Sequence, residues 1–318
     1  MIDTYCTLNL SRIKNHEWYN CPMSVLPVRK AVIAAAGFGT RFLPQTKAMP
    51  KEMLPLVDKP IIQYIVEELA EAGIEDIVIV TGYHKRSIED HFDYMSTDLR
   101  LNLKNGGKED LLEQTKRISD LANFVYVRQK GPYGNATPLM NVQHLIGDEP
   151  FIYTYADDLI VAEPNRFSQM ITQYEKTKSS VLPCIRVEKD VDFKRYGIVA
   201  GDEMEDGVLR MTTIVEKPGK EQAPSNLASI GGYLLTPDIF EYLKKASHEI
   251  PEGQEFQVQP AMRQMITDGK QLLAVEVKNA KYYDTGNKLE YVKTVVDFAL
   301  KHDDIKDNFM EYLRSLSV

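Results

Sequence analysis

Apolar residues change their spacing along the chain in a way that predicts alternating strands and helices. Residues 31–36 form a continuous apolar run that ends at a glycine, which is typical of a strand buried on both faces. Apolar positions then recur at helical spacing from Ile61 to Ala72, and Gly73 ends that helix. Residues 77–80 are typical of the next buried strand. These elements form a β-loop-α-β unit with a long first loop.

The same alternation continues to about residue 160. Further strands are expected at 124–127 and 151–155, and helices fit at 86–96, 110–121 and 136–145. We therefore expect the first half of the domain to form a mainly parallel sheet covered by helices.

The second half of the chain is richer in strand patterns and less regular. Strands are expected at 181–187, 196–200, 208–216, 228–235 and 271–277. Helices are expected near 165–177, 237–246, 257–267 and 287–302, with a short one after them. Because neither a low-complexity linker nor an internal repeat interrupts the sequence, residues 29–318 are predicted to form one continuous α/β domain. Its fold class is a Rossmann-like, mainly parallel or mixed central sheet covered by helices, with residues 161–318 as an elaborated β-rich half.

Residues 1–28 show neither helical nor strand periodicity and are interpreted as an N-terminal arm. Met23 precedes a short segment that runs directly into the first apolar run. One hypothesis is that Met23 is the natural start and that residues 1–22 are not native. The alternative is an ordered capping segment.

Composition narrows the class of protein. The chain has 318 residues, of which 43% are hydrophobic, and its 38 basic and 46 acidic residues give a net charge of −8. An acidic balance argues against a generic nucleic-acid binder. No apolar run is long enough to span a membrane, and Asp3 stands where a secretory signal would need apolar residues. We expect a cytoplasmic protein without a membrane partner. Three scattered cysteines favour neither a disulfide framework nor a zinc site.

The loop after the first strand is rich in glycine and cations. Gly37 and Gly39 allow a close approach of backbone N–H groups to a phosphate. Phe42 stands where a dinucleotide fingerprint has its third glycine, and a P-loop lysine does not follow Gly39. Three cations on this loop can hold a polyphosphate: Arg41, Lys47 and Lys51.

The order of residues in this segment is more specific than its glycines. Residues 37–55 follow the pattern G-x-G-T-R-x-L-P-x-T-K-x-x-P-K-E-M-L-P, and V-D-K-P-I follows at 57–61. This string resembles the sugar-1-phosphate nucleotidylyltransferases, and most closely the bacterial UTP–glucose-1-phosphate uridylyltransferases. The resemblance extends from residue 29 to about 300, and it implies a nucleotide-binding half at 29–160 and a sugar-phosphate-binding half with C-terminal helices at 161–318. It implies Mg²⁺-assisted, in-line transfer of a uridylyl group from UTP to glucose 1-phosphate, which gives UDP-glucose and pyrophosphate.

The resemblance also assigns the catalytic and metal-binding residues. Arg41 and Lys51 are expected to bind the triphosphate and stabilise the transition state, unless one of them merely pairs with a neighbouring carboxylate. Asp157 and Asp284 are expected to bind Mg²⁺, which needs only one or two protein carboxylates. Asp158 is expected to be a simple turn residue.

Nucleotide binding is implied for a larger group of residues. Gln129 suits the imide of uracil because its amide offers both a donor and an acceptor. Asn135 stands where the family commonly has histidine, which leaves the choice of base open. The full set of expected nucleotide-binding residues is Ala35, Ala36, Gly37, Gly39, Thr40, Glu52, Gln129 and Gly134.

The sugar phosphate is expected to bind at two strings that match the family, Y-G-I-V and E-K-P. Gly197 lets the sugar approach the backbone, Glu216 accepts hydrogen bonds from sugar hydroxyls, and Lys217 meets the phosphate. Gly232 replaces a family arginine, and Pro260 stands in a segment that usually borders the sugar site. A different hexose phosphate therefore remains open.

Several functions stay open at this stage. The leading one takes UTP and glucose 1-phosphate as substrates; the nearest alternative uses another sugar 1-phosphate or dTTP. A catalytically silent nucleotide-sugar-binding homologue is a different class, although the retained charged residues argue against it. A nicotinamide-dependent dehydrogenase is disfavoured by the missing third glycine. A homo-oligomer, dimer or tetramer, is expected from the family.

Overall fold

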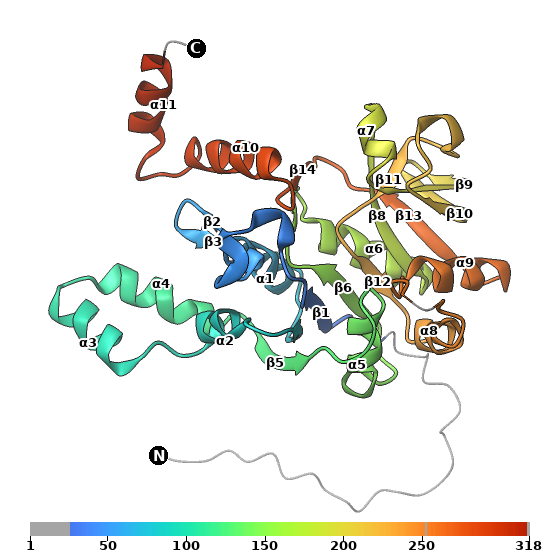
Figure 1. Cartoon of the computed structure of the whole chain (residues 1–318), viewed down its shortest axis with the longest axis horizontal. Helices are drawn as coiled ribbons and strands as arrows, with labels where there is room; N and C mark the ends of the chain where they lie inside the picture. Colours follow the sequence, from blue (N-terminus) through green and yellow to red (C-terminus); the bar gives the residue numbers. More distant parts are fainter. Residues whose placement is uncertain (1–25, 252, 317–318) are drawn as a thin grey trace, which may run out of the picture.

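The computed structural model describes residues 26–251 and 253–316 (Figure 1). The hypothesis of a start at Met23 lies outside the described residues, as does nearly all of the predicted N-terminal arm. In the part of the chain that is described, no helix combines the length and the apolar character needed to cross a membrane.

A ten-stranded sheet forms the centre of the described residues. Its strand order is β11-β9-β10-β13-β8-β12-β6-β1-β4-β5. In chain order these strands are β1 (Lys30–Ala35), β4 (Asp76–Thr81), β5 (Asn123–Arg128), β6 (Phe151–Tyr155), β8 (Ser180–Arg186), β9 (Gly197–Glu205), β10 (Val208–Glu216), β11 (Leu227–Ser229), β12 (Tyr233–Leu235) and β13 (Leu272–Glu276).

The first half of the chain supplies the parallel part of this sheet. Strand β1 pairs in parallel with β4 on one side and β6 on the other, and β5 continues the parallel arrangement beyond β4. In the shared register Val32 lies between Val78 and Tyr153, and all three are buried. A strand flanked on both edges and covered on both faces must be apolar throughout, which explains the continuous apolar run at 31–36. The predicted α/β sheet is confirmed.

The second half extends the same sheet rather than forming another one. Strand β12 pairs antiparallel with β6, placing Tyr233 opposite Tyr153. Strand β8 then joins β12 to β13, and the long hairpin β9–β10 completes that edge. The sheet is therefore mixed, and the two halves of the chain meet at the β6–β12 border. The predicted division into a single domain with two halves stays a prediction.

Helices cover both faces of the sheet and close two apolar clusters. Alternating residues of β1 separate the faces, since Ile33 belongs to one cluster and Val32 to the other. The first cluster contains residues of α1 and α6, and the second contains residues of α5, α8 and α9. Each fully buried Ile or Leu side chain contributes about 1.5–3 kcal/mol. The α-helices are α1 (Ile61–Glu71), α2 (Arg86–Phe92), α3 (Thr97–Asn105), α4 (Glu109–Ser119), α5 (Thr137–Ile146), α6 (Arg166–Thr177), α7 (Asp190–Phe193), α8 (Ile239–Ser247), α9 (Gln259–Thr267), α10 (Lys288–Ala299) and α11 (Lys306–Ser315).

The predicted strand at 228–235 is wrong in one respect, because the structure divides it into β11 and β12. Gly231 and Gly232 lie between them with φ of +70° and +108°. A Cβ at Gly232 would lie 2.3 Å from the carbonyl oxygen of Tyr153. The two glycines therefore let the chain leave β11, which pairs with β8 and β9, and continue as β12, which pairs with β6.

Other elements were missed or misjudged from the sequence. The helix expected at 86–96 ends at Phe92, and α3 follows it as a separate helix whose only buried residue is Leu103. Helices α3 and α4 lie together away from the main sheet (Figure 1). Two two-stranded sheets were also missed: β7 (Asp158–Val161) with β14 (Lys281–Asp284), and β2 (Pro55–Leu56) with β3 (Lys59–Pro60). The remaining short turns are the 3₁₀ helices η1 (Thr40–Phe42), η2 (Gln45–Lys47), η3 (Lys51–Met53) and η4 (Lys220–Gln222).

Candidate active site

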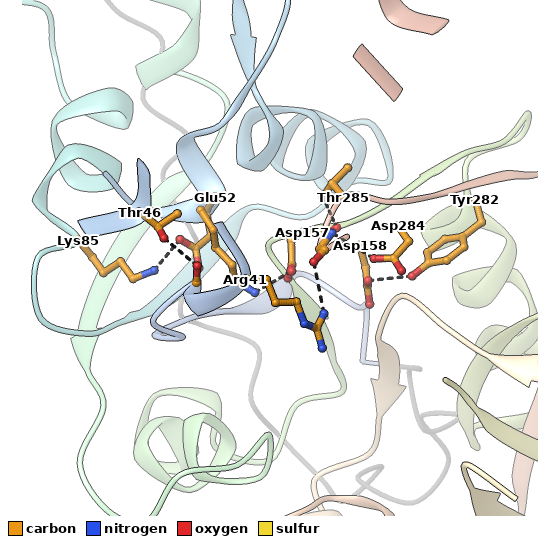
Figure 2. A network of polar contacts seen from close by, with 12 residues as sticks. Arg41, Thr46, Glu52, Lys85, Asp157, Asp158, Tyr282, Asp284 and Thr285 are labelled. Atoms are coloured by element: carbon orange, nitrogen blue, oxygen red, sulfur yellow. Dashed lines mark hydrogen bonds and ion pairs between the residues drawn. The ribbon is translucent and has the colours of Figure 1, made fainter. Parts of the chain in front are cut away.

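Polar side chains gather where the parallel strands β1 and β6 end. Strand β1 leads into the glycine-rich loop, and β6 leads into a turn at Ala156 and Asp157. Because the carboxyl ends of parallel strands meet at one edge of a sheet, the two segments lie beside each other. Figure 2 shows the resulting network of polar contacts, with Asp157 at its centre.

Lys51 and Asp157 are the first pair of predicted residues that the structure brings together. Lys51 begins η3, and its Nζ lies 2.6 Å from Oδ2 of Asp157. Burial alone would lower the pKa of Lys51, but the charges of Asp157 and Glu52 outweigh it and raise that pKa. The lysine therefore stays charged at the border between the glycine-rich loop and β6.

Glu52, the next residue of η3, points the other way. Its Oε2 accepts a hydrogen bond of 2.6 Å from Nζ of Lys85, and both side chains are buried (Figure 2). Burial raises the pKa of Glu52 against the charges of Lys85 and Lys51, and burial lowers the pKa of Lys85 against Glu52. The pair lies behind the loop rather than in either cavity described below, so the expected contact of Glu52 with a base stays a prediction.

Asp284 reaches the same site from the far end of the chain. Strand β14 pairs antiparallel with β7, which places Asp284 opposite Asp158 and next to the β6–β7 turn. Its Oδ1 accepts a hydrogen bond of 3.1 Å from the N–H of Gly286, and Nη1 of Arg195 lies 3.7 Å from its Oδ2. Burial raises the pKa of Asp284, with a smaller increase from the charge of Asp157 and an opposing effect of Arg195.

The segment after Asp284 closes around Asp157. The hydroxyl of Thr285 donates a hydrogen bond of 2.5 Å to the carbonyl oxygen of Asp157, and Nη1 of Arg41 donates one of 3.3 Å to the carbonyl oxygen of Gly286. Arg41 thereby joins the glycine-rich loop to the acidic segment (Figure 2).

The two carboxylates that were expected to bind metal share one small space. A Cβ at Gly286 would lie 3.2 Å from Oδ2 of Asp157, 3.3 Å from Oδ1 of Asp284 and 3.4 Å from Nη1 of Arg41. Two carboxylates that lie beside the same glycine, with no side chain of that residue between them, suit a hard divalent cation. Among the described residues no group of three or more His, Cys, Asp or Glu side chains is arranged to hold a metal. The donor set therefore fits a cation that takes its other ligands from substrate and water.

Asp158 is not the simple turn residue that the sequence suggested. It begins β7 and is half-buried, and its Oδ1 accepts a hydrogen bond of 3.1 Å from the hydroxyl of Tyr282. Burial, with the neighbouring charge of Asp157, raises the pKa of Asp158 to about 6. The sequence could not show this, because Tyr282 comes from a strand 124 positions away.

A cavity of about 980 Å³ lies over the glycine-rich loop. Six of the residues expected to bind the nucleotide or its phosphates line it together with Gly134: Ala36, Gly37, Thr40, Arg41, Lys51 and Gln129. Ala35 and Gly39 do not line this cavity. Gly39 has a φ of +65° and its carbonyl oxygen accepts a hydrogen bond of 2.7 Å from the hydroxyl of Thr46, so it shapes the loop.

A second cavity, of about 620 Å³, contains the residues expected to bind the sugar phosphate. Gly197, Glu216 and Lys217 line it together with Asp157 and Asp284. A Cβ at Gly197 would lie 3.0 Å from Oε2 of Glu216, so the glycine leaves room for that carboxylate. Six residues line both cavities and show where the two meet: Arg41, Asn135, Tyr155, Asp157, Glu216 and Lys217.

Sequence reasoning missed two polar residues of the second cavity. Arg195 directly precedes the Y-G-I-V string and faces Asp284, and this adjacency was the available signal. Gln259 donates a long hydrogen bond of 3.4 Å from Nε2 to Oε2 of Glu216. Gln259 directly precedes Pro260 in the segment expected to border the sugar site, but its contact joins the start of α9 to the end of β10, which no local pattern shows.

Comparisons with known proteins identify the family of this chain. The sequence profile described as nucleotidyl transferase matches residues 30–299. The chain is 46% identical to the UTP–glucose-1-phosphate uridylyltransferase of Bacillus subtilis strain 168, over 91% of this chain and 97% of that protein. It is 44% identical to UTP–glucose-1-phosphate uridylyltransferase 1 of Staphylococcus saprophyticus, over 92% of this chain and all of that protein.

Solved structures lead to the same family. A UDP-glucose pyrophosphorylase in complex with UDP-glucose superposes with a TM-score of 0.77 and is 41% identical, covering 86% of this chain and 100% of that one. A UTP-bound enzyme of this type from Acinetobacter baumannii superposes with a TM-score of 0.82 at 33% identity, covering 91% of this chain and 100% of that one. Enzymes of the family typically use a divalent metal. With the profile spanning most of its length and relatives at this level of identity, the chain belongs to the nucleotidyl transferase family.

Proposed function

We propose that this protein is a UTP–glucose-1-phosphate uridylyltransferase that makes UDP-glucose and pyrophosphate. The observation that carries the proposal is the junction of the two cavities, where Arg41, Asp157 and Lys217 line both. A transfer between two phosphorylated substrates needs two pockets that meet at cations and carboxylates, and catalysis then consists of positioning and charge stabilisation. The names of the relatives support uridylyl transfer in particular.

The larger cavity would hold UTP. The amide of Gln129 offers a donor and an acceptor to the imide edge of uracil, beside the backbone of Gly37. Arg41 and Lys51 line the part of this cavity that borders Asp157, and the triphosphate would lie there. Charged hydrogen bonds of this kind contribute about 1.5–3 kcal/mol each.

Asp157 and Asp284 would hold Mg²⁺ in the space beside Gly286. When bound, the cation neutralises phosphate charge and helps to orient the α-phosphate. In this structure Oδ2 of Asp157 is paired with Nζ of Lys51 at 2.6 Å. If Asp157 held the cation instead, Lys51 would be available to contact the phosphates and balance their charge.

The smaller cavity would hold glucose 1-phosphate. Glu216 would accept hydrogen bonds from sugar hydroxyls, and Lys217, which has a φ of +48°, would contact the sugar phosphate. A phosphate oxygen of the sugar phosphate then attacks the α-phosphorus of UTP. The new P–O bond forms as the bond from the α-phosphorus to the bridging oxygen breaks, and pyrophosphate leaves with that bond's electron pair. Arg41 and Lys51 stabilise the charge that spreads over the phosphoryl oxygens.

Pyrophosphate release from the purified protein tests this function. The assay contains Mg²⁺, one of UTP, dTTP, CTP or ATP, and one of several sugar 1-phosphates. We expect fast release with UTP and glucose 1-phosphate. A maximum with another pair would change the substrate assignment, and binding of UTP without release in any pair would identify a silent nucleotide-sugar-binding protein.

The predicted homo-oligomer and cytoplasmic location stay predictions. Light scattering coupled to size exclusion would measure the molar mass against the 36.3 kDa of one chain.

A further inference from the structure

Two large aromatic side chains stand exposed at the nucleotide cavity. Phe38 is 61% exposed and Tyr133 is 63% exposed, and both line that cavity. Their ring centroids are 5.5 Å apart with an angle of 62° between the planes, an edge-to-face arrangement. The rings come from different loops, since Phe38 follows β1 and Tyr133 follows β5.

The loop that carries Phe38 is held by hydrogen bonds to its neighbour Gly39. The carbonyl oxygen of Gly39 accepts one of 2.7 Å from the hydroxyl of Thr46 and one of 2.9 Å from the N–H of Phe42. Phe38 therefore projects from a loop whose backbone is fixed.

The loop that carries Tyr133 is held against the segment before α9. The carbonyl oxygen of Tyr133 accepts a hydrogen bond of 2.7 Å from the N–H of Phe256. At the next residue, a Cβ on Gly134 would lie 2.0 Å from the carbonyl oxygen of Phe256, so the two backbones touch. The side chain of Asn135 accepts a hydrogen bond of 2.8 Å from the N–H of Val258. Both rings are thus placed in advance at low entropic cost.

Packing does not explain these rings. Burial of an aromatic side chain removes a large apolar area from water, yet most of both rings remains in solvent. A single exposed aromatic residue needs no explanation, but these two are in edge-to-face contact in the lining of one cavity. Edge-to-face packing also leaves the second face of each ring unused. The same cavity contains Gln129 and the backbone of Gly37, where a base would be recognised.

We propose that Phe38 and Tyr133 form an aromatic clamp that stacks on the nucleobase of the nucleotide substrate. The inference rests on the proposed function in one respect, namely that the larger cavity takes the nucleotide. Stacking is tolerant of the kind of base because every base has a π-face. The clamp therefore supplies affinity, and the choice of uracil falls to the amide of Gln129.

Binding measurements on Tyr133→Ala test the clamp. Titration calorimetry compares UTP, CTP and inorganic tripolyphosphate, which lacks a base. A base that stacks on an aromatic ring gains affinity from that contact, so removal of the Tyr133 ring should weaken nucleotide binding by about tenfold. We expect this loss for UTP and for CTP alike, so that their affinity ratio is unchanged, and we expect tripolyphosphate to bind as before.

Three further variants complete the experiment. Phe38→Ala should weaken UTP binding in the same direction, and Tyr133→Phe, which keeps the ring, should bind UTP as the unchanged protein does. Tyr94→Ala is the matched control, because Tyr94 is 79% exposed and lies outside the cavity. It should leave every affinity unchanged.

Each adverse result has a distinct meaning. Equal loss of UTP and tripolyphosphate in Tyr133→Ala would show a displaced loop and overturn the clamp, as would unchanged UTP binding in that variant. If the unchanged protein binds tripolyphosphate as tightly as it binds any nucleotide, the base adds no affinity and the clamp is refuted. If it binds no phosphorylated ligand at all, the proposed function fails together with the clamp.

Discussion

The buried pair Glu52–Lys85 offers a quantitative test of how the catalytic loop is held. Lys51 and Glu52 are consecutive in η3, and one faces Asp157 while the other faces Lys85. The side chains of Glu52 and Lys85 are 0% and 5% exposed, with 2.6 Å between Oε2 and Nζ. Within the described residues, Oε1 of Glu52 has no hydrogen-bond partner. Solvent cannot replace a lost charge here.

Removal of one charge of the Glu52–Lys85 pair should therefore lower the free energy of unfolding much more than removal of both charges. Lys85→Met leaves a buried carboxylate without its cation, and Glu52→Gln leaves a buried ammonium without its anion. Each change should lower the free energy of unfolding by about 3–5 kcal/mol. The double variant leaves only a buried amide that is incompletely hydrogen-bonded, which should cost about 1–3 kcal/mol. The two single effects are thus expected to be strongly non-additive.

Urea unfolding followed by circular dichroism measures these values, provided that the m-values agree among the variants. The matched control is Lys176→Met, because Lys176 and Glu205 form a pair of similar length, 2.9 Å, whose side chains are 52% and 51% exposed. That change should cost less than about 1 kcal/mol. Single effects at Glu52 and Lys85 that are as small as the control, or that simply add, would refute the reasoning.

Three other predictions concern the site and the fold. Asp157→Asn should preserve folding but lower turnover by at least about a hundredfold through poor cation placement; an unchanged rate of pyrophosphate release in saturating Mg²⁺ would contradict the metal assignment. Lys217→Ala should mainly raise the KM for the sugar phosphate, and a kinetic effect confined to UTP would contradict its role. Burial lowers the pKa of His91 below 6.5, so the neutral ring, 2.9 Å from Oε1 of Gln63, contributes stability above pH 6.5 that is lost as the pH falls toward the lower folded pKa. Unfolding free energies at about pH 7.5 and about pH 5.5 should therefore differ less in His91→Gln than in the unchanged protein, and an equal difference would count against this assignment.

Local patterns were sufficient for the elements whose apolar residues are buried in the core. The apolar run at 31–36 identified β1, and helical spacing identified α1 to within a residue, because both are fixed by burial alone. Helix α3 escaped because only Leu103 is buried, although Ser96, whose hydroxyl accepts a hydrogen bond of 3.2 Å from the N–H of Leu99, is a capping signal that could have been used. The single strand expected at 228–235 failed because its apolar pattern outweighed the two glycines.

The candidate site was predicted as a set of residues but not as an arrangement. Its motifs named Lys51, Asp157 and Asp284, yet no local pattern indicates that β14 pairs with β7. That pairing joins segments such as Thr285 and Asp157, 128 positions apart. Strands of four residues have no periodicity of their own, so only the folded chain shows that Asp158 of β7 bonds Tyr282 of β14.

Two departures from the family pattern, Gly232 and Asn135, contact backbone atoms of neighbouring segments. Their contacts indicate whether the protein has kept its activity. Gly232 stands where the family has arginine, but a Cβ there would meet the carbonyl oxygen of Tyr153 at 2.3 Å. Asn135 stands where the family commonly has histidine, and its amide bonds the N–H of Val258 and the hydroxyl of Tyr155. Each replacement thus has a packing or hydrogen-bonding role of its own. A chain that had lost its activity would be free to lose cavity charges, whereas here the charged groups remain and the changes concern local fit. We therefore expect these departures to alter the shape of the sugar cavity and its selectivity, and not the capacity for transfer.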